Sequence, residues 1–229
     1  MRAMRSLADS PRGQGWGPSR SPKRILVYGV TGSGKTTLAR GIGEATGLPW
    51  HSVDDEIGWL PGWVERPRDE QRDLAARIAA SDEWVLDTAY GHWRDVVLAR
   101  AELIVALDYP RLVSLARLLR RTGRRVVTGE RACNGNRESL RQALSSESII
   151  GWHFRSFSSK RDRIATWEAD PSSPPVVRLR SPRITQAWLE DLRRSGSGRS
   201  RPAGRVVSNE PRTGRARPAG RLRRGPWPA

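Results

Sequence analysis

The 229-residue chain is strongly basic, with 41 Lys and Arg against 24 Asp and Glu and a formal net charge of +17 at pH 7. This length suits one α/β domain with extensions, and it is enough to bury a core without disulfides or a structural metal. The single cysteine, Cys133, excludes an internal disulfide and a cysteine-based zinc site. No apolar run approaches the roughly 18 residues that a membrane span needs. Residues 1 to 23 also lack the apolar stretch of a signal peptide, so we expect a cytoplasmic protein.

The positive charge is concentrated at the two ends of the chain. Residues 1 to 23 carry a net charge of +4 and residues 195 to 229 carry +8, which leaves +5 for residues 24 to 194. Both end segments are rich in Gly, Pro and polar residues and are predicted to be disordered. We therefore expect one folded domain over residues 24 to 194, between a basic N-terminal extension and an Arg/Pro/Gly tail. Such ends would bind nucleic acid phosphates without sequence preference.

The most specific motif is a phosphate-binding loop, G-x-x-x-x-G-K-[ST], which starts at Gly29 and ends in Gly34-Lys35-Thr36. An apolar run predicts a strand over residues 25 to 28, and a helix follows the loop over residues 36 to 46. In such loops backbone N–H groups surround the phosphates of ATP, the Lys reaches the β- and γ-phosphates, and the Thr hydroxyl binds Mg²⁺. The predicted nucleotide-binding residues are Gly29, Thr31, Gly32, Ser33, Gly34, Lys35, Thr36 and Thr37.

Lysine is rare in this chain, which has 38 arginines but only three lysines, Lys23, Lys35 and Lys160. Lys35 stands out against this bias. Arginine cannot replace a compact ammonium group that reaches between phosphates, which supports a phosphate-binding role for Lys35.

Three of the further predicted strands run into acidic residues. The predicted strands cover residues 48 to 53, 84 to 87, 103 to 107 and 176 to 179. Asp54, Asp87 and Asp108 stand at the ends of the first three. Carboxylates at the carboxyl ends of parallel strands lie where such a sheet binds its ligands. We expect Asp87 to hold Mg²⁺ together with Thr36, and Asp54 or Asp55 to orient or deprotonate the acceptor hydroxyl. The alternatives are a solvated acidic turn after residue 53 and, for Asp108, a bond to the amides of the next helix.

Several residues are candidates for binding the phosphoryl acceptor. They are Asp55, Trp59, Tyr90, Arg94 and Arg137. Trp59 and Trp63 flank a Pro-Gly turn, where tryptophans either cover a substrate or pack the turn. Arg94 lies after the third strand and suits a phosphate or a carboxylate.

A row of arginines follows a predicted helix over residues 111 to 121, whose buried face is expected to hold Leu112, Leu115, Ala116 and Leu119. Arg120, Arg121, Arg124, Arg125, Arg131 and Arg137 are the predicted charge supply of a lid over about residues 120 to 137. Four of them crowd into six residues, so their repulsion favours an anionic partner such as the triphosphate. Gly123 and Gly129 would give the lid freedom to close. We assign catalytic roles to Arg120 and Arg124, with a solvated basic face or a nucleic-acid contact as the alternative.

The remaining predicted helices cover residues 67 to 80, about 147 to 167, and 182 to 194, with one more around Leu140 and Leu144. Strands that alternate with helices, with a phosphate loop after the first strand, predict a doubly wound parallel sheet.

Together these features resemble the adenylate-kinase-like branch of phosphate-loop kinases, and most closely the bacterial DNA-topology-modulation proteins and related adenylate kinases. The resemblance covers about residues 24 to 192. It is carried by residues 29 to 36, 54 to 63, 84 to 94, 107 to 108, 118 to 122, 134 to 138 and 178 to 182. It implies a five-stranded sheet in the order 2-3-1-4-5, ATP with Mg²⁺ as phosphoryl donor, and a mobile arginine-bearing lid.

Two departures limit this resemblance. Adenylate kinases carry Asp-Gly-Phe-Pro-Arg after the third strand, whereas residues 87 to 91 here read Asp-Thr-Ala-Tyr-Gly, so their AMP site is not carried over. Cys133 also stands where the closer family has a tryptophan.

The leading hypothesis is a kinase that moves the γ-phosphoryl group of Mg-ATP to a small acceptor, with a nucleotide as one candidate. The alternative is a nucleotide-binding regulatory protein that contacts nucleic acid through its basic ends. The strand-end carboxylates favour the kinase, because a nucleic-acid binder does not need them.

Overall fold

A five-stranded parallel sheet forms the centre of the protein. The computed structural model describes residues 21 to 130, 133 to 136 and 149 to 197. The strands are β1 (Arg24–Gly29), β2 (Trp50–His51), β5 (Trp84–Leu86), β6 (Leu103–Leu107) and β7 (Val176–Leu179). They lie in the order β2-β5-β1-β6-β7, with every neighbouring pair parallel. When the five strands of this sheet are numbered in chain order, the arrangement is 2-3-1-4-5. The predicted fold class is therefore confirmed.

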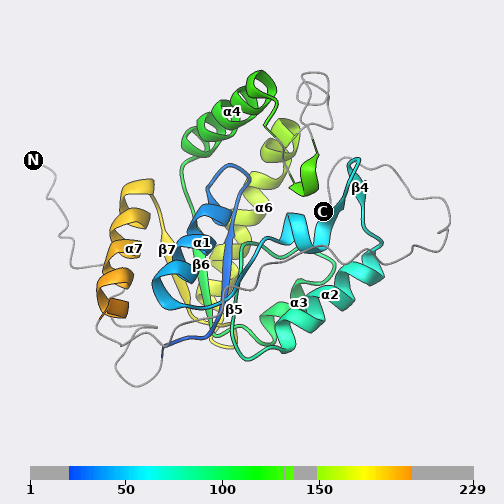
Figure 1. The fold of residues 1–229 in the computed structure, drawn as a ribbon. Helices are drawn as coiled ribbons and strands as arrows, with labels where there is room; N and C mark the ends of the chain where they lie inside the picture. The colour runs from blue at the N-terminus through cyan, green and yellow to red at the C-terminus, as the bar shows by residue number, and fades with distance from the viewer. Residues whose placement is uncertain (1–20, 131–132, 137–148, 198–229) are drawn as a thin grey trace, which may run out of the picture.

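Helices cover both faces of the sheet (Figure 1). One face packs against α1 (Lys35–Thr46) and α7 (Pro182–Ser197). The other packs against α2 (Arg68–Ala80), α3 (Arg94–Leu98) and α6 (Ile149–Ala169). The sequence predicts four of these helices to within three residues at each end, but it misses α3, whose five residues are too few to show a helical period.

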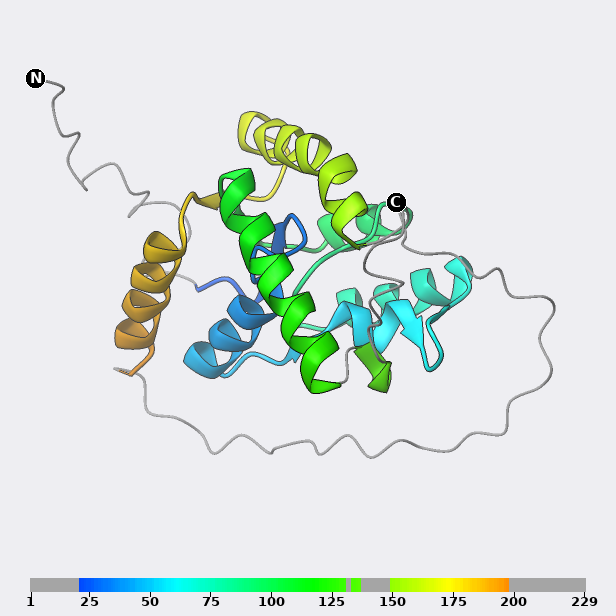
Figure 2. The same ribbon diagram turned by 90° about the horizontal axis from the view of Figure 1, so that it is seen from above.

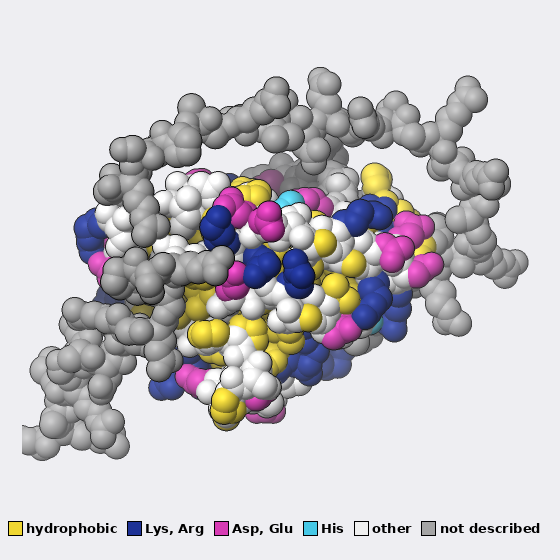
Figure 3. Space-filling view, turned by 90° about the horizontal axis from the view of Figure 1, so that it is seen from below, with side chains coloured by type: hydrophobic (Ala, Val, Ile, Leu, Met, Phe, Trp, Pro, Cys, Tyr) yellow, Lys and Arg dark blue, Asp and Glu magenta, His cyan; other side chains and the backbone are white. Residues whose placement is uncertain are grey.

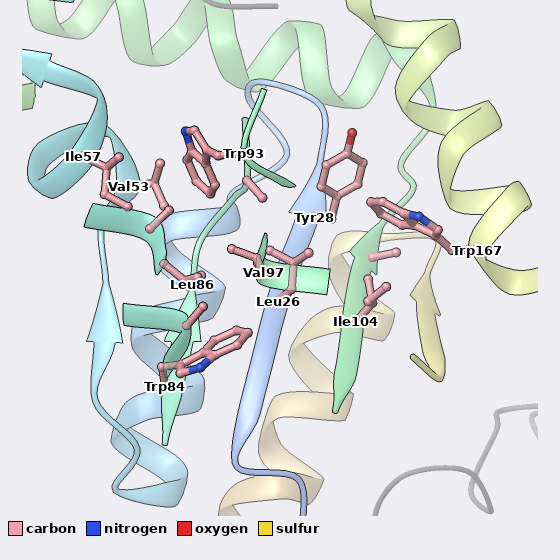
Figure 4. Close-up of a cluster of buried hydrophobic side chains, with 14 of the residues drawn as sticks. Leu26, Tyr28, Val53, Ile57, Trp84, Leu86, Trp93, Val97, Ile104 and Trp167 are labelled. Carbon is pink, nitrogen blue, oxygen red and sulfur yellow. The ribbon is translucent and has the colours of Figure 1, made fainter. Parts of the chain in front are cut away.

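The side chains of β1 divide between two hydrophobic cores. Ile25 and Val27 face α1 and α7, whereas Leu26 and Tyr28 face α2, α3 and α6. Figure 4 shows Leu26 and Tyr28 among the aromatic side chains of the second core. Because both faces of a doubly wound sheet are covered, its strands are apolar at successive positions rather than alternating. The same burial explains why the strands were recognisable from short apolar runs.

The helix α4 (Arg111–Thr128) crosses above the phosphate loop (Figure 2). It differs from the prediction because it does not end at Arg121. It runs through Gly123 and ends at Gly129, whose φ of +65° is the left-handed conformation that commonly ends a helix. Gly123 is therefore part of a continuous helix, whereas the sequence analysis expected the helix to end before it.

The buried face of α4 also differs from the prediction. Leu112 and Leu119 are 78% and 47% exposed, while Ser114, Leu118 and Thr122 are buried. Ser114 Oγ lies 2.9 Å from His153 Nε2 of α6, in a buried hydrogen bond. The helix thus contacts the protein along one narrow stripe, and two of its three buried side chains, Ser114 and Thr122, are small and polar. A pattern of leucines alone does not reveal such a stripe.

Ion pairs link the amino ends of neighbouring strands, at the end of the sheet opposite the phosphate loop. Lys23 Nζ lies 2.8 Å from Glu83, and Arg24 lies 2.7 Å from Glu102.

Seen from below, the described surface carries Lys and Arg interspersed with Asp and Glu (Figure 3). None of the helices in the described residues is long and apolar enough to cross a membrane.

The two-sided burial of β1 predicts a large loss of stability when one of its core side chains is shortened. Leu26→Ala should lower the free energy of unfolding by about 2–5 kcal/mol, because it removes fully buried methyl groups and leaves a cavity. Leu112→Ala is the matched control on α4, and it should change the value by under about 0.5 kcal/mol. Urea denaturation of both variants measures the difference. Equal losses would contradict the burial assigned to these two leucines.

Candidate active site

A cavity of about 850 Å³ lies where the carboxyl ends of β1 and β5 meet α4 and α6. The predicted site residues that line it are Thr31, Gly32, Gly34, Lys35, Thr36, Thr37, Asp54, Asp55, Asp87, Tyr90, Arg94, Arg120 and Arg124. Arg131, Arg137 and the predicted helix around Leu140 and Leu144 lie outside the described residues.

The phosphate loop joins β1 to α1 by a tight turn. Gly32 and Gly34 have φ angles of +82° and +96°, which other residues adopt only with strain. The backbone N–H and the hydroxyl of Ser33 both donate to the Val30 carbonyl, at 3.2 and 2.7 Å, and close the turn. No side chain caps the first N–H groups of α1. Those groups, at the positive end of the helix dipole, suit an anion.

Gly32 also sets the position of α4. A Cβ atom at Gly32 would lie 2.4 Å from the Ser114 carbonyl oxygen and 2.9 Å from Leu118 Cβ. No real side chain fits there. The absence of a side chain at Gly32 therefore allows α4 to lie directly over the loop.

Lys35 points into the site and lies close to two carboxylates. Its ammonium group donates to the Val30 carbonyl at 3.2 Å. Burial lowers the pKa of Lys35, while Asp87 and Asp54 act in the opposite direction. The lysine that the sequence singled out is thus placed beside the acidic residues expected at the strand ends.

Thr36 and Asp87 meet as expected of a magnesium site. The Thr36 hydroxyl donates to Asp87 Oδ2 at 2.6 Å, and the Val53 N–H donates to Asp87 Oδ1 at 3.0 Å. Burial and the nearby Asp54 raise the pKa of Asp87 to about 6, against these two hydrogen bonds and Lys35. A buried carboxylate beside a hydroxyl suits Mg²⁺, which keeps several waters and takes few protein ligands.

Asp54 lies in η2 (Asp54–Gly58), a short π-helical turn that follows the two-residue strand β2. The Tyr90 hydroxyl donates a short hydrogen bond to Asp54 Oδ1. Burial, followed by Asp54, raises the pKa of Tyr90 well above its usual value, so this hydroxyl stays protonated and remains a donor. Tyr90, predicted to bind the acceptor, thus positions Asp54 in the cavity wall.

Asp55 holds a neighbouring segment in place. Its carboxylate accepts hydrogen bonds from the Ser52 hydroxyl at 2.5 Å and from the Asn134 N–H at 2.9 Å. Asn134 belongs to η3 (Cys133–Gly135), and its side-chain amide also donates to the Asp55 carbonyl at 2.6 Å. Asp55 lines the cavity, but these bonds occupy its carboxylate. Asp54 is therefore the better placed of the two predicted carboxylates for acceptor chemistry.

The Pro-Gly turn connects β3 (Trp59–Leu60) and β4 (Val64–Glu65), an antiparallel pair. Trp59 is buried and packs edge to face on Trp63, with ring centroids 5.7 Å apart. Trp63, and not Trp59, lines the cavity. Asn136 fixes the turn, because its side-chain oxygen accepts from the N–H groups of Gly62 and Trp63 at 2.6 and 3.0 Å. The structure thus assigns packing to Trp59.

Five arginines of α4 line the cavity: Arg117, Arg120, Arg121, Arg124 and Arg125. Arg117 is an addition to the prediction. Its guanidinium would lie 3.1 Å from a Cβ atom at Gly34, so it reaches over the phosphate loop. Helical spacing back from Arg120 and Arg121 would have found it. Arg124 pairs with Glu130 at 2.8 Å. These five arginines therefore lie on one face of a helix.

Lys160 of α6 is a site residue that the sequence reasoning missed. Its ammonium group lies 3.4 Å from the Gly29 carbonyl oxygen and 5.4 Å from the centroid of the Tyr28 ring. Burial and, secondarily, the charge of Lys35 lower the pKa of Lys160 to about 7. The rarity of lysine, which drew attention to Lys35, was equally a signal for Lys160.

Asp108 has neither of the two roles considered for it. Its carboxylate lies 2.7 Å from Arg178 of β7 and 2.8 Å from Arg161 of α6. The helix that follows has Pro110 before its first residue and no side-chain cap. Asp108 therefore joins β6, β7 and α6, and it is not among the residues that line the cavity.

No protein-family model matches the chain, and no curated protein matches it. Solved structures that resemble it include a shikimate kinase from Acinetobacter baumannii, with 18% identity, a TM-score of 0.48, and coverage of 78% of this chain and 96% of that one. A gluconokinase from Sinorhizobium meliloti 1021 has 20% identity and a TM-score of 0.43, with coverage of 77% of this chain and 95% of that one. A sugar kinase from Janibacter sp. HTCC2649 has 18% identity and a TM-score of 0.43, with coverage of 76% of this chain and 97% of that one. Likenesses this distant assign neither a family nor a substrate.

The depressed pKa of Lys160 predicts a distinct pH dependence of stability. Between about pH 7 and 10 the unfolded chain carries a proton on this amine that the folded protein does not, so wild-type stability should rise with pH relative to Lys160→Gln. Urea denaturation of both proteins at pH 7 and pH 9.5 measures this, and the difference between them isolates Lys160 from other titrating groups. Parallel curves would show that the folded pKa is not lowered.

Proposed function

We propose that this protein is an ATP-dependent kinase that transfers the γ-phosphoryl group of Mg-ATP to a small acceptor. One observation carries the proposal: a phosphate loop at the start of α1 lies between a Thr36–Asp87 pair and a row of arginines from α4. Phosphoryl transfer requires these parts, because its catalysis consists mainly of positioning and charge stabilisation.

The donor half of the site would be built by α1 and α4. The backbone N–H groups of residues 31 to 36 would bind the phosphates of ATP, and Lys35 would reach the β- and γ-phosphates. Thr36 and Asp87 would hold Mg²⁺, which neutralises charge on the phosphates when bound. Arg117, Arg120 and Arg124 would neutralise the charge that spreads over the phosphoryl group in transit.

The acceptor half would be formed around Asp54. The acceptor oxygen forms its bond to the γ-phosphorus, the bond to the β–γ bridging oxygen breaks, and ADP leaves with that oxygen. The hydroxyl proton passes to the Asp54 carboxylate, which Tyr90 holds in position. The sequence resemblance to adenylate-kinase-like proteins makes a nucleotide one candidate acceptor. The departure at residues 87 to 91 removes the residues that would mark an AMP site.

The alternative of a nucleic-acid-binding regulator rests on the basic ends of the chain. Residues 1 to 20 and 198 to 229 lie outside the described residues. The kinase proposal depends only on the described site and does not require a role for either end.

Lys35→Ala should abolish acceptor-dependent turnover of ATP to ADP while leaving the melting temperature nearly unchanged. The phosphate cradle is made of backbone, but its charge comes from this ammonium group. A coupled assay of ADP release across a panel of small hydroxyl acceptors measures the activity. Lys35→Arg should also be inactive, and Lys23→Arg is the matched control. Wild-type turnover by Lys35→Ala would overturn the assignment of the phosphate loop.

Asp87→Asn and Asp54→Asn should separate metal binding from phosphoryl transfer. The Asp87 variant should lose most of the Mg²⁺ dependence of nucleotide binding, because it removes the carboxylate next to Thr36. The Asp54 variant should keep nucleotide affinity and lower kcat by about tenfold or more, as expected for a lost proton acceptor. Calorimetric titration with a non-hydrolysable ATP analogue, with and without Mg²⁺, distinguishes the two. Identical behaviour of both variants would contradict these roles.

A further inference from the structure

A second cavity, of about 460 Å³, adjoins the one that contains the phosphate loop. The residues that line both cavities are Tyr28, Gly91, Arg94, Trp152 and Lys160. The lining of the second cavity includes five basic residues and no acidic ones. The basic residues are Arg68, Arg94, Arg155, Lys160 and Arg163. They come from α2, α3 and α6, so the fold brings them together from distant parts of the sequence.

The cations are close enough to influence their neighbours. Burial lowers the pKa of His92, and the charge of Arg68 lowers it further. Burial raises the pKa of Tyr28, and the charge of Arg163 acts in the opposite direction. Arg68 is also the first residue of α2, where the helix dipole disfavours a cation. An anion in the cavity would offset the unfavourable position of Arg68.

Nearby carboxylates are already engaged. Asp95 follows Arg94 in sequence, but it forms a two-point ion pair with Arg72, at 2.6 and 2.9 Å. Glu70, in the first turn of α2, lies 3.6 Å from Arg66. Arg94 itself donates to the Tyr28 hydroxyl at 3.4 Å and lies over the Trp167 ring. Glu65 also acts on His92 from nearby, but neither it nor Asp95 nor Glu70 is among the residues that line the cavity.

The walls otherwise suit a small organic ligand. Tyr28 and Trp152 contribute aromatic surface, and ligand cavities commonly combine such walls with a few placed polar groups. Guanidinium groups bind the paired oxygens of phosphates and carboxylates in a fork. A phosphate monoester carries a charge of roughly −1.5 to −2 at pH 7, which matches a group of several cations better than a single carboxylate does.

We propose that the second cavity binds a dianionic oxyanion group of the phosphoryl acceptor, as a phosphate monoester or a dicarboxylate, and directs the acceptor hydroxyl toward Asp54. This proposal rests on the kinase function proposed above and adds the chemical class of the acceptor. Lys160, shared by the two cavities, lies between the anionic end of the acceptor and the phosphate loop.

The test first fills the phosphate loop and then probes the second cavity. The full-length protein is saturated with Mg²⁺ and a non-hydrolysable ATP analogue, and it is titrated by calorimetry with ribose 5-phosphate, succinate and ribose. Ribose 5-phosphate or succinate should bind at least tenfold more tightly than ribose, and which of them does so identifies the oxyanion. If neither binds more tightly than ribose while the analogue is bound, the inference is overturned and the kinase proposal stands. If the analogue itself does not bind, both proposals fail.

Variants locate the binding. The double change Arg68→Gln and Arg163→Gln should weaken binding of the successful probe by tenfold or more, and it should leave analogue affinity unchanged. Arg77→Gln, an exposed arginine at the other end of α2, is the matched control and should bind the probe like wild type. Melting curves of each variant verify folding, and Lys160→Gln provides a second reading at the shared wall. Probe binding that survives in both cavity variants would place the anion elsewhere and overturn the inference.

Discussion

The close approach of α4 to the phosphate loop is the constraint on which the rest of the site depends. The Ser114 carbonyl occupies space that any side chain at Gly32 would need. This contact fixes the height of α4 above the loop, and the buried Ser114–His153 hydrogen bond fixes its position relative to α6. Once those two relations are set, the arginines at positions 117 to 125 face the loop, and Lys160 of α6 reaches the Gly29 carbonyl.

The fold could be predicted from the sequence because its strongest signals are local. Both faces of β1 and β6 are buried, so the strands appear as short apolar runs, and the phosphate loop marks where the first of them must turn into a helix. A right-handed parallel arrangement then follows from alternation of strands and helices. By contrast, α3 has five residues, and the shortened β2 gives way to a π-helical turn, so neither carries a period that a sequence reveals.

The role of a site residue could be predicted where its motif or its place at a strand end indicates one chemical use. It could not be predicted where contacts between distant parts of the chain determine the role. Lys35, Thr36 and Asp87 belong to a motif or a strand end, and the structure brings them together. The roles of Asp54 and Asp55 depend instead on Tyr90 and Asn134, which are 36 and 79 residues away. Trp59 and Trp63 stand in the same turn, and only packing determines that the first is buried and the second lines the cavity.

The balance of charge divides the site into two regions that suit different ligands. Near the phosphate loop, Asp54 and Asp87 partly offset Lys35, and this mixture of signs suits a metal-bound triphosphate. Toward α2 and α3, Asp95 forms a surface ion pair with Arg72, and the lining of the second cavity includes basic side chains but no acidic ones. Arginines that line the same cavity repel one another. Binding of an anion removes that repulsion. An acceptor that carries an oxyanion, as proposed above, would gain affinity from charges that the fold already holds in place.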